Sequence, residues 1–234
     1  MTAEQVLPDD LRSALARIGH ADVLVGIPCF NSARTIGHVV TAVEVGLRTH
    51  FPDLRATVLL SDGGSSDDTI GAALAAGGRD VVDRCLVDGS SPEPEKVGFV
   101  YRGIPGKGSA FRAIFESAGV LGARACAVVD SDLRSITPSW VHRLVSPVAR
   151  LGYDFVAPVY ERHRFDGTIT NSIAYPLTTA LYGTRLRQPI GGDFGFSGRL
   201  AAEYASRHVW DTDVARFGVD IWMTTVAVVE GHRI

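Results

Sequence analysis

Two aspartates in this 234-residue chain, Asp130 and Asp132, directly follow a run of apolar residues at 126–129. Residues two apart in an extended segment project to the same side, so the two carboxylates should converge. Like charges at short range repel, and a hard cation such as Mg²⁺ or Mn²⁺ relieves the repulsion while keeping open positions for phosphate oxygens. The pair therefore indicates a metal site, and the alternative is a solvated turn that caps the helix near Pro138.

A lysine between two glycines, Gly106-Lys107-Gly108, stands at the start of an expected helix. Backbone N–H groups, the helix dipole and an ammonium group can converge there on a phosphate, and a diphosphate is the natural ligand. The segment is not a Walker loop, because Lys107 is followed by glycine rather than serine or threonine. The alternative is a surface turn with a solvated lysine.

The turn at 61–67 is dense in Gly, Ser and Asp and lies between an expected strand and an expected helix. Asp62 could hold a ribose or a base there, and the glycines permit close approach. The dinucleotide fingerprint is missing after the first strand, which disfavours a dehydrogenase. Segment 195–199 misses the nucleophile elbow because its fifth residue is Arg199, which disfavours a serine hydrolase.

The elements that position these residues alternate between short apolar strands and helices. Strands are expected at 22–27, 56–60, 125–129 and at either 81–87 or 97–101, with helices at 32–49, 67–76 and 108–118. This alternation predicts an α/β fold with a mostly parallel sheet and helices on both faces. Ligands bind at the carboxyl ends of such strands, where the polar clusters 28–32, 61–68 and 130–134 lie.

The second half of the chain has a different pattern. We expect a helix at 139–151, a strand at 154–160, a helix at 170–183, a loop at 188–198 and a helix that follows a loop at 218–229. A short helix at 8–19 precedes the first strand. We therefore expect an N-terminal helical appendage (1–20) and two lobes of one domain (21–132 and 133–234), the first for the nucleotide-sugar and the second for its acceptor.

Composition narrows the class of protein. The chain is 46% hydrophobic, with 23 Lys plus Arg, 26 Asp plus Glu and a net charge of −3. Disordered tails and disulfide scaffolds are thereby excluded, and no basic patch suggests nucleic acid. No apolar run approaches the roughly 20 residues of a membrane span, and the first ten residues do not form a secretory signal. Three cysteines without C-x-x-C spacing indicate a reducing, cytoplasmic location.

Taken in order, these motifs resemble the nucleotide-sugar glycosyltransferases of the GT-A fold, a Rossmann-like fold. The resemblance implies that Asp62 lies by the nucleotide and Lys107 by the base or diphosphate. It also implies that Asp130 and Asp132 form a D-x-D metal site for Mg²⁺ or Mn²⁺. The nucleotide-sugar site is then expected to comprise Pro28, Asn31, Asp62, Gly63, Lys107, Asp130 and Ser131.

The second half is similar in residue type, order and spacing to the retaining mannosylglycerate, glucosylglycerate and glucosyl-3-phosphoglycerate synthases. Those enzymes transfer a hexose to glycerate or its phosphate. The resemblance implies that Arg162 and Thr170 hold the acceptor carboxylate, and that Asp220 contacts acceptor or donor hydroxyls. The expected acceptor site comprises Arg162, Thr170, Gly191, Gly192, Asp193 and Asp220, and the expected catalytic aspartates are Asp130, Asp132 and Asp220.

This chain departs from the family pattern at one metal ligand. The family supplies a metal-binding histidine beyond the helix that holds Asp220, and His232 comes too early in the pattern to be that ligand. The chain is therefore expected to be truncated after Ile234. A homodimer fits the resemblance, and the donor base (guanine or uracil) and the hexose stay open. Two other functions are also open: an inverting polysaccharide transferase and a sugar-nucleotide-binding module without turnover.

Overall fold

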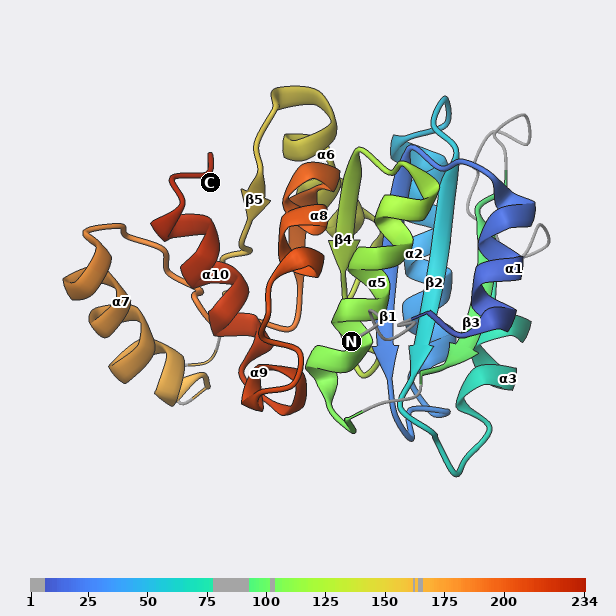
Figure 1. Cartoon of the computed structure of the whole chain (residues 1–234), viewed down its shortest axis with the longest axis horizontal. Coiled ribbons are helices and arrows are strands. Elements are labelled where there is room, and N and C mark those ends of the chain that lie inside the picture. Colours follow the sequence, from blue (N-terminus) through green and yellow to red (C-terminus); the bar gives the residue numbers. More distant parts are fainter. Residues whose placement is uncertain (1–6, 78–92, 102–103, 162, 164–165) are drawn as a thin grey trace.

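The computed structural model of the chain describes residues 7–77, 93–101, 104–161, 163 and 166–234 (Figure 1). Its centre is a six-stranded sheet in the order β3-β2-β1-β4-β6-β5. The first four strands in the chain are parallel, and β6 is antiparallel to both β4 and β5. The predicted α/β fold with a mostly parallel sheet is confirmed. The strands are β1 (Val23–Cys29), β2 (Ala56–Asp62), β3 (Glu95–Val100), β4 (Ala125–Val128), β5 (Phe155–Val156) and β6 (Phe194–Ser197).

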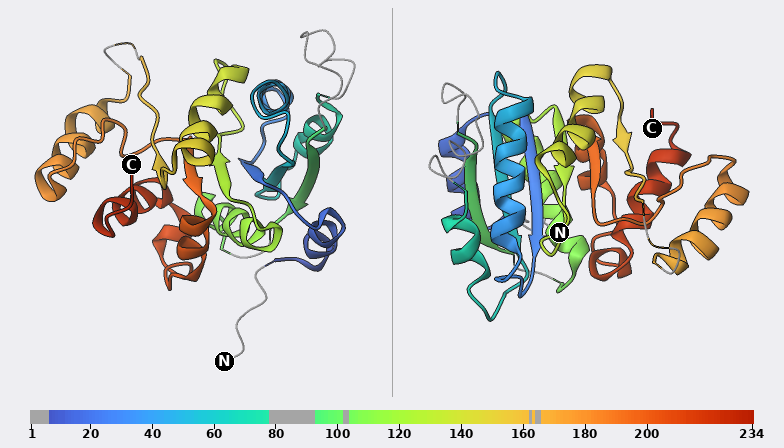
Figure 2. Two further views of the ribbon diagram at one scale, coloured as in Figure 1. Left: turned by 90° about the horizontal axis from the view of Figure 1, so that it is seen from above. Right: turned by 180° about the vertical axis from the view of Figure 1, so that it is seen from behind.

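Helices cover both faces of the sheet (Figure 2). One face carries α2 (Ile36–His50) and α6 (Pro138–Leu151), and the other carries α1 (Asp9–Ile18), α5 (Lys107–Leu121) and α8 (Gly198–Ser206). Each face buries its own apolar core. The remaining helical segments are α3 (Thr69–Ala75), the π-helical turn η1 (Thr170–Ala174), α7 (Tyr175–Tyr182), α9 (Asp213–Arg216) and α10 (Val219–Val229).

The alternation of side chains along β1 explains why the sheet is covered on both sides. Val23, Val25 and Ile27 pack under α2 and α6, whereas Leu24 packs under α1 and α5. Gly26 allows α5 to approach closely, because a Cβ atom there would lie 2.5 Å from Cδ1 of Ile114. Strands that are buried on both faces consist mainly of apolar residues, so the polar residues of this part of the chain gather where the strands end.

The parallel register aligns these strand ends. Cys29 at the end of β1 pairs with Asp62 at the end of β2, and Gly26 pairs with Val128 at the end of β4. The segments 28–32, 61–68 and 130–134 therefore emerge at one edge of the sheet, as the sequence predicts.

The prediction of a loop at 188–198 is wrong, because this segment contains β6, which lies between β4 and β5 in the sheet. Phe194 and Phe196 are fully buried there and pack on Phe155 and Phe115, respectively. A four-residue strand that contains a glycine is too short to show a periodic pattern. Conversely, the strand expected at 154–160 is shorter than predicted, because only β5 (Phe155–Val156) is a strand there.

Other boundaries also differ from expectation. The helix expected from Asn31 or Ser32 begins only at Ile36, after a turn in which the Ser32 carbonyl accepts hydrogen bonds from the N–H groups of Thr35 and Ile36. The strand at 97–101 is present as β3, whereas the alternative at 81–87 lies outside the described residues.

The N-terminal helix packs into the body of the protein, since Leu11 and Leu15 of α1 are buried in the core beneath α5. The sheet combines strands from 21–132 and from 133–234, so the division into two lobes stays a prediction about binding rather than about folding. Among the described helices, none has the length and apolar character to cross a membrane. The cytoplasmic location stays a prediction; Cys29 and Cys126 are free thiols, and both are buried.

Candidate active site

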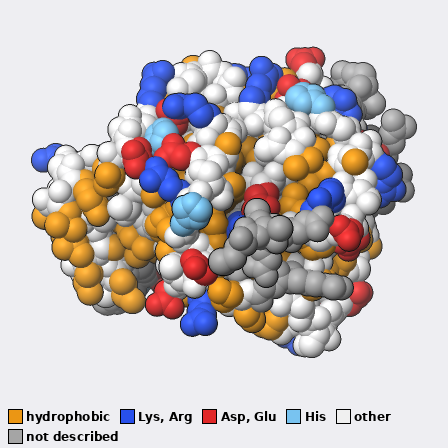
Figure 3. All heavy atoms as spheres, in the orientation of Figure 1, with side chains coloured by type: hydrophobic (Ala, Val, Ile, Leu, Met, Phe, Trp, Pro, Cys, Tyr) orange, Lys and Arg blue, Asp and Glu red, His pale blue; other side chains and the backbone are white. Residues whose placement is uncertain are grey.

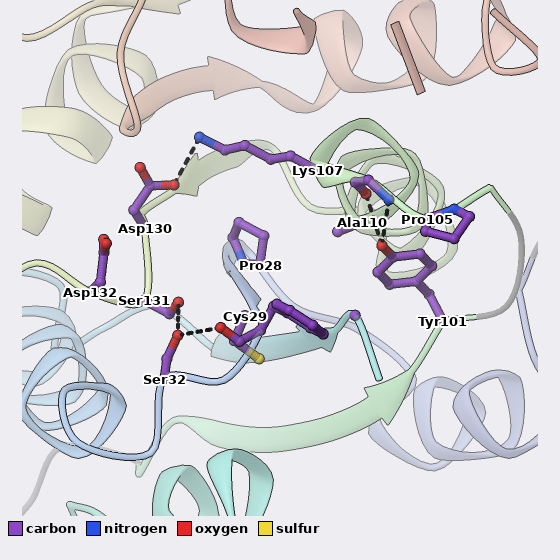
Figure 4. A pocket seen from close by; sticks show the side chains of 13 residues that line it. Pro28, Cys29, Ser32, Tyr101, Pro105, Lys107, Ala110, Asp130, Ser131 and Asp132 are labelled. Carbon is purple, nitrogen blue, oxygen red and sulfur yellow. Dashed lines mark hydrogen bonds and ion pairs between the residues drawn. The ribbon is translucent and has the colours of Figure 1, made fainter. Parts of the chain in front are cut away.

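A cleft of about 460 Å³ opens at the carboxyl ends of β1, β2 and β4, beside the first turn of α5 (Figure 4). This donor cleft, as we call it, brings together most of the residues predicted for the nucleotide-sugar site. Its lining includes Pro28, Gly63, Lys107, Asp130, Ser131 and Asp132.

Lys107 reaches across the donor cleft from α5. Its Nζ atom lies 2.8 Å from Oδ1 of Asp130 and 3.2 Å from Oδ1 of Asp220, which is in the first turn of α10. Burial acts to lower the pKa of Lys107, but the attraction of the two carboxylates outweighs it and the pKa is raised. The ammonium is thus held in its charged form inside the cleft.

Asp130 is surrounded closely by protein. Burial raises its pKa, Lys107 opposes that change, and the neighbouring Asp132 adds to it. A Cβ atom on Gly192 would lie only 1.8 Å from Oδ2 of Asp130, so that position accepts no side chain. Gly192, predicted for the acceptor site, therefore fixes where the Asp130 carboxylate can lie.

Asp132 is exposed at the rim of the cleft, whereas Ser131 is buried. The Ser131 hydroxyl lies 2.8 Å from that of Ser32 (Figure 4). The Ser131 carbonyl accepts a hydrogen bond from the Thr35 hydroxyl. These bonds anchor the D-x-D segment to the turn after β1, so that Asp130 and Asp132 can both face the cleft.

The two carboxylates fit a hard divalent cation. Mg²⁺ is usually held by one or two carboxylates together with substrate phosphates and water, so the oxygen donors present are of the right kind. The described residues contain no group of three or more His, Cys, Asp or Glu side chains that could hold a metal. Asp130 and Asp132 therefore supply part of a shell that a bound diphosphate would have to complete.

Asp62 does not line the donor cleft. Its buried carboxylate accepts hydrogen bonds from the N–H groups of Gly64 and Ser65 and from the Ser65 hydroxyl. Asn31 has a positive φ of 49° and binds the same turn, through its N–H to Ser65 and its side-chain oxygen to Ser66 N–H. These two residues shape the turn at 61–66, and their predicted contact with the nucleotide stays a prediction.

The start of α5 is held from two sides. The Tyr101 hydroxyl both donates to the Gly106 carbonyl and accepts from the Gly106 N–H, each at 2.9 Å. On the other side α9 packs so closely that a Cβ atom on Gly108 would lie 2.0 Å from the Val214 carbonyl oxygen. The glycines that flank Lys107 are thus needed for the close packing of α9 against the start of α5.

A second cleft, of about 1000 Å³, adjoins the first and shares Asp130 with it. Asp193 lies fully buried at its base and accepts hydrogen bonds from Trp140 (3.1 Å) and Tyr160. Its other oxygen accepts a 3.3 Å hydrogen bond from the Asp130 N–H. Burial raises the pKa of Asp193 to about 6, partly offset by the Tyr160 hydrogen bond and reinforced by the charge of Asp130.

The structure gathers only some of the predicted acceptor residues. Gly192 and Asp193 line the second cleft, whereas Gly191 and Thr170 line neither cleft; Thr170 is buried in η1. Arg162 lies outside the described residues. Asp220 contacts Lys107 rather than the second cleft, and burial raises its pKa to about 6 against the opposing attraction of Lys107.

Sequence reasoning missed three aromatic residues that organise the site. Tyr160 and Trp140 hold Asp193, and Tyr101 holds Gly106. No local signal distinguishes these aromatic residues from the many that fill the two cores. Their role comes from contacts across 33, 53 and 5 residues of sequence, respectively.

The sheet, the acidic pair at the end of β4 and the lysine at the start of α5 match a GT-A, Rossmann-like fold. No protein-family model matches the chain. The chain is 27% identical over 184 residues to the glucosyl-3-phosphoglycerate synthase of Mycolicibacterium smegmatis. The matched region covers 74% of this chain and 55% of the relative. The chain thus spans about half the length of that relative.

Solved structures of the glucosyl-3-phosphoglycerate synthase of Mycobacterium tuberculosis are similar to this chain. The complex with Mn²⁺, UDP and phosphoglyceric acid is 26% identical with a TM-score of 0.56, over 80% of this chain and 60% of that one. The complex with Mg²⁺ and UDP is 27% identical with a TM-score of 0.53, over the same shares of 80% and 60%.

Proposed function

We propose that this chain is a metal-dependent glycosyltransferase that moves glucose from UDP-glucose to 3-phosphoglycerate. The observation that carries the proposal is the meeting of the two clefts at Asp130, with Lys107 2.8 Å away. The similarity to glucosyl-3-phosphoglycerate synthases supports uracil as the donor base and phosphoglycerate as the acceptor. We assign the donor to the lobe 21–132 and the acceptor to the lobe 133–234.

The donor cleft has the chemistry that a nucleoside diphosphate requires. The turns after β1 and β2 form its floor, and Gly63 and Gly106 both line it. Lys107 would turn from the carboxylates to the diphosphate and stabilise the charge that develops on the leaving group. Asp132 and Asp130 would hold the divalent cation. When bound, such an ion acts as a Lewis acid on the diphosphate oxygens.

We assign the reacting sugar to the boundary between the two clefts, because Asp130 lines both. Both oxygens of Asp193 accept hydrogen bonds from protein groups, which fix the position of its carboxylate. The resemblance to retaining synthases supports retention, and we propose that the acceptor attacks from the side of the leaving group. The bond from the anomeric carbon to the diphosphate oxygen breaks, the acceptor hydroxyl oxygen takes its place, and the hydroxyl proton passes to the departing diphosphate.

The test is to incubate the full chain with UDP-glucose, Mn²⁺ and 3-phosphoglycerate, and to follow UDP release and the product by NMR. We expect a glucosyl product with the anomeric configuration of the donor. A product of opposite configuration would identify an inverting transferase. Binding of UDP without transfer or hydrolysis would identify a binding module, and parallel arms with GDP-mannose, GDP-glucose and glycerate test base, hexose and acceptor.

A further inference from the structure

The second cleft contains an arginine that the resemblance does not assign. Arg143 of α6 lines this cleft, and it is the one Lys or Arg among the described lining residues. Its side chain is exposed, and it takes part in no ion pair with another described residue. A guanidinium in such a position keeps its hydrogen-bond donors available to a ligand.

Hydroxyl groups accompany Arg143 on the same wall. Ser139 lies one helical turn before Arg143, so the two side chains project from the same face of α6. The Ser139 hydroxyl lies 2.9 Å from that of Thr137, the residue that precedes the helix, and both residues line the cleft. Three groups that can donate hydrogen bonds therefore follow one another along this wall.

None of the carboxylates of the described cleft lining forms an ion pair with Arg143. Asp130 is paired with Lys107. Asp193 accepts hydrogen bonds from Trp140, Tyr160 and a backbone N–H. Two further carboxylates, Glu161 and Asp166, belong to the segment after β5 rather than to α6. An anionic group that enters the cleft is therefore favoured at the α6 wall.

We propose that Arg143 binds the phosphate of a phosphorylated acceptor in the second cleft and selects that acceptor over its unphosphorylated form. Arginine suits this role because its planar guanidinium can make two parallel hydrogen bonds to phosphate oxygens. The sugar-accepting end then points toward Asp130, which the second cleft shares with the donor cleft. The inference rests on the proposed function, since it deepens the acceptor part of that site.

The test compares Arg143→Gln with Arg17→Gln by calorimetric titration of the full chain, preloaded with UDP and Mn²⁺. Arg17 is exposed on α1 and lines neither cleft, which makes it a matched control. We expect Arg143→Gln to weaken 3-phosphoglycerate binding by about tenfold or more, equivalent to about 1.4 kcal/mol. Arg143→Lys should recover part of that loss, and glycerate binding should change by less than about threefold.

The outcomes separate this inference from the proposed function. Unchanged 3-phosphoglycerate binding in Arg143→Gln, an equal loss in Arg17→Gln, or an equal loss for glycerate would each overturn the role of Arg143. A native chain that binds UDP but not 3-phosphoglycerate would overturn it as well, while leaving the donor cleft intact. Failure of UDP to bind the native chain would instead remove the proposed function itself.

Discussion

The Nζ atom of Lys107 lies 2.8 Å from Oδ1 of Asp130, which joins the first turn of α5 to the end of β4 across the donor cleft. The same ammonium lies 3.2 Å from Asp220 of α10. One lysine thus connects the start of α5 and the end of β4 with α10, a helix from the C-terminal part of the chain. A diphosphate and its cation would have to compete for these same charges.

Replacing Lys107 with glutamine should lower kcat/KM for UDP-glucose by about 10- to 100-fold, because a charged hydrogen bond is worth about 1.5–3 kcal/mol. The control is Lys96→Gln: Lys96 pairs with the buried Glu44 at 3.0 Å and lines neither cleft. That variant should lose stability but keep kcat/KM per folded molecule within about twofold. Steady-state kinetics and thermal unfolding distinguish the two, and equal kinetic losses would contradict the role of Lys107.

Asp132→Ala should raise the Mn²⁺ concentration needed for half-maximal turnover by about tenfold or more, because it removes one of two carboxylates in the expected shell. Asp213→Ala is the control, since the Asp213 side chain is 95% exposed on α9 and lines neither cleft. Metal titrations of the transfer reaction check both variants. Near-native turnover at the same Mn²⁺ concentration in Asp132→Ala would rule out the assigned role.

Two adjacent glycines offer a steric test. Gly192→Ala would place a Cβ atom 1.8 Å from Oδ2 of Asp130, whereas Gly191→Ala would meet nothing closer than 3.5 Å. The first variant must displace the carboxylate, so we expect a loss of activity together with about 1–3 kcal/mol of stability. The second should stay near the native protein in both respects. Urea unfolding and transfer assays decide, and indistinguishable variants would refute the close contact.

Asp193 should make stability fall with rising pH between about 4 and 6. Its pKa is raised to about 6 by burial, so in this range the folded protein holds a proton that the unfolded chain has released. A single such group contributes at most about 1.4 kcal/mol per pH unit. Asp193→Asn removes this contribution, so the native-minus-variant difference in unfolding free energy should decline from pH 4 to 6 and level off near pH 7.

Denaturant unfolding of both proteins across this pH range measures that difference. Asp154 and Glu203, whose pKa values are lowered by their arginine and histidine partners although burial opposes this, push stability in the opposite direction. They are common to both proteins, so their effect cancels in the comparison. Parallel curves for the native protein and Asp193→Asn would show that Asp193 does not titrate as the structure indicates.

Apolar side chains are exposed along η1 and α7, and local sequence motifs do not predict this exposure. Ile173, Leu177 and Leu181 are exposed along η1 and α7, and apolar side chains gather over this end of the molecule (Figure 3). In the sequence these residues have the spacing of a helix that packs on a core. Their periodicity predicts the helix, but whether a core lies against it depends on the rest of the chain.

By itself, the sequence determined the α/β alternation, the polar strand end that carries Asp130 and Asp132, and the glycine-flanked helix start that carries Lys107. These follow from local patterns, because apolar runs of strand length and glycine-rich turns constrain the backbone over a few residues. Only the tertiary structure decided that Lys107 contacts Asp220, that Asp193 holds Trp140 and Tyr160, and that β6 lies inside the sheet. Those relationships join segments far apart in the chain, and they are selected by packing and by the requirement that buried polar groups find partners.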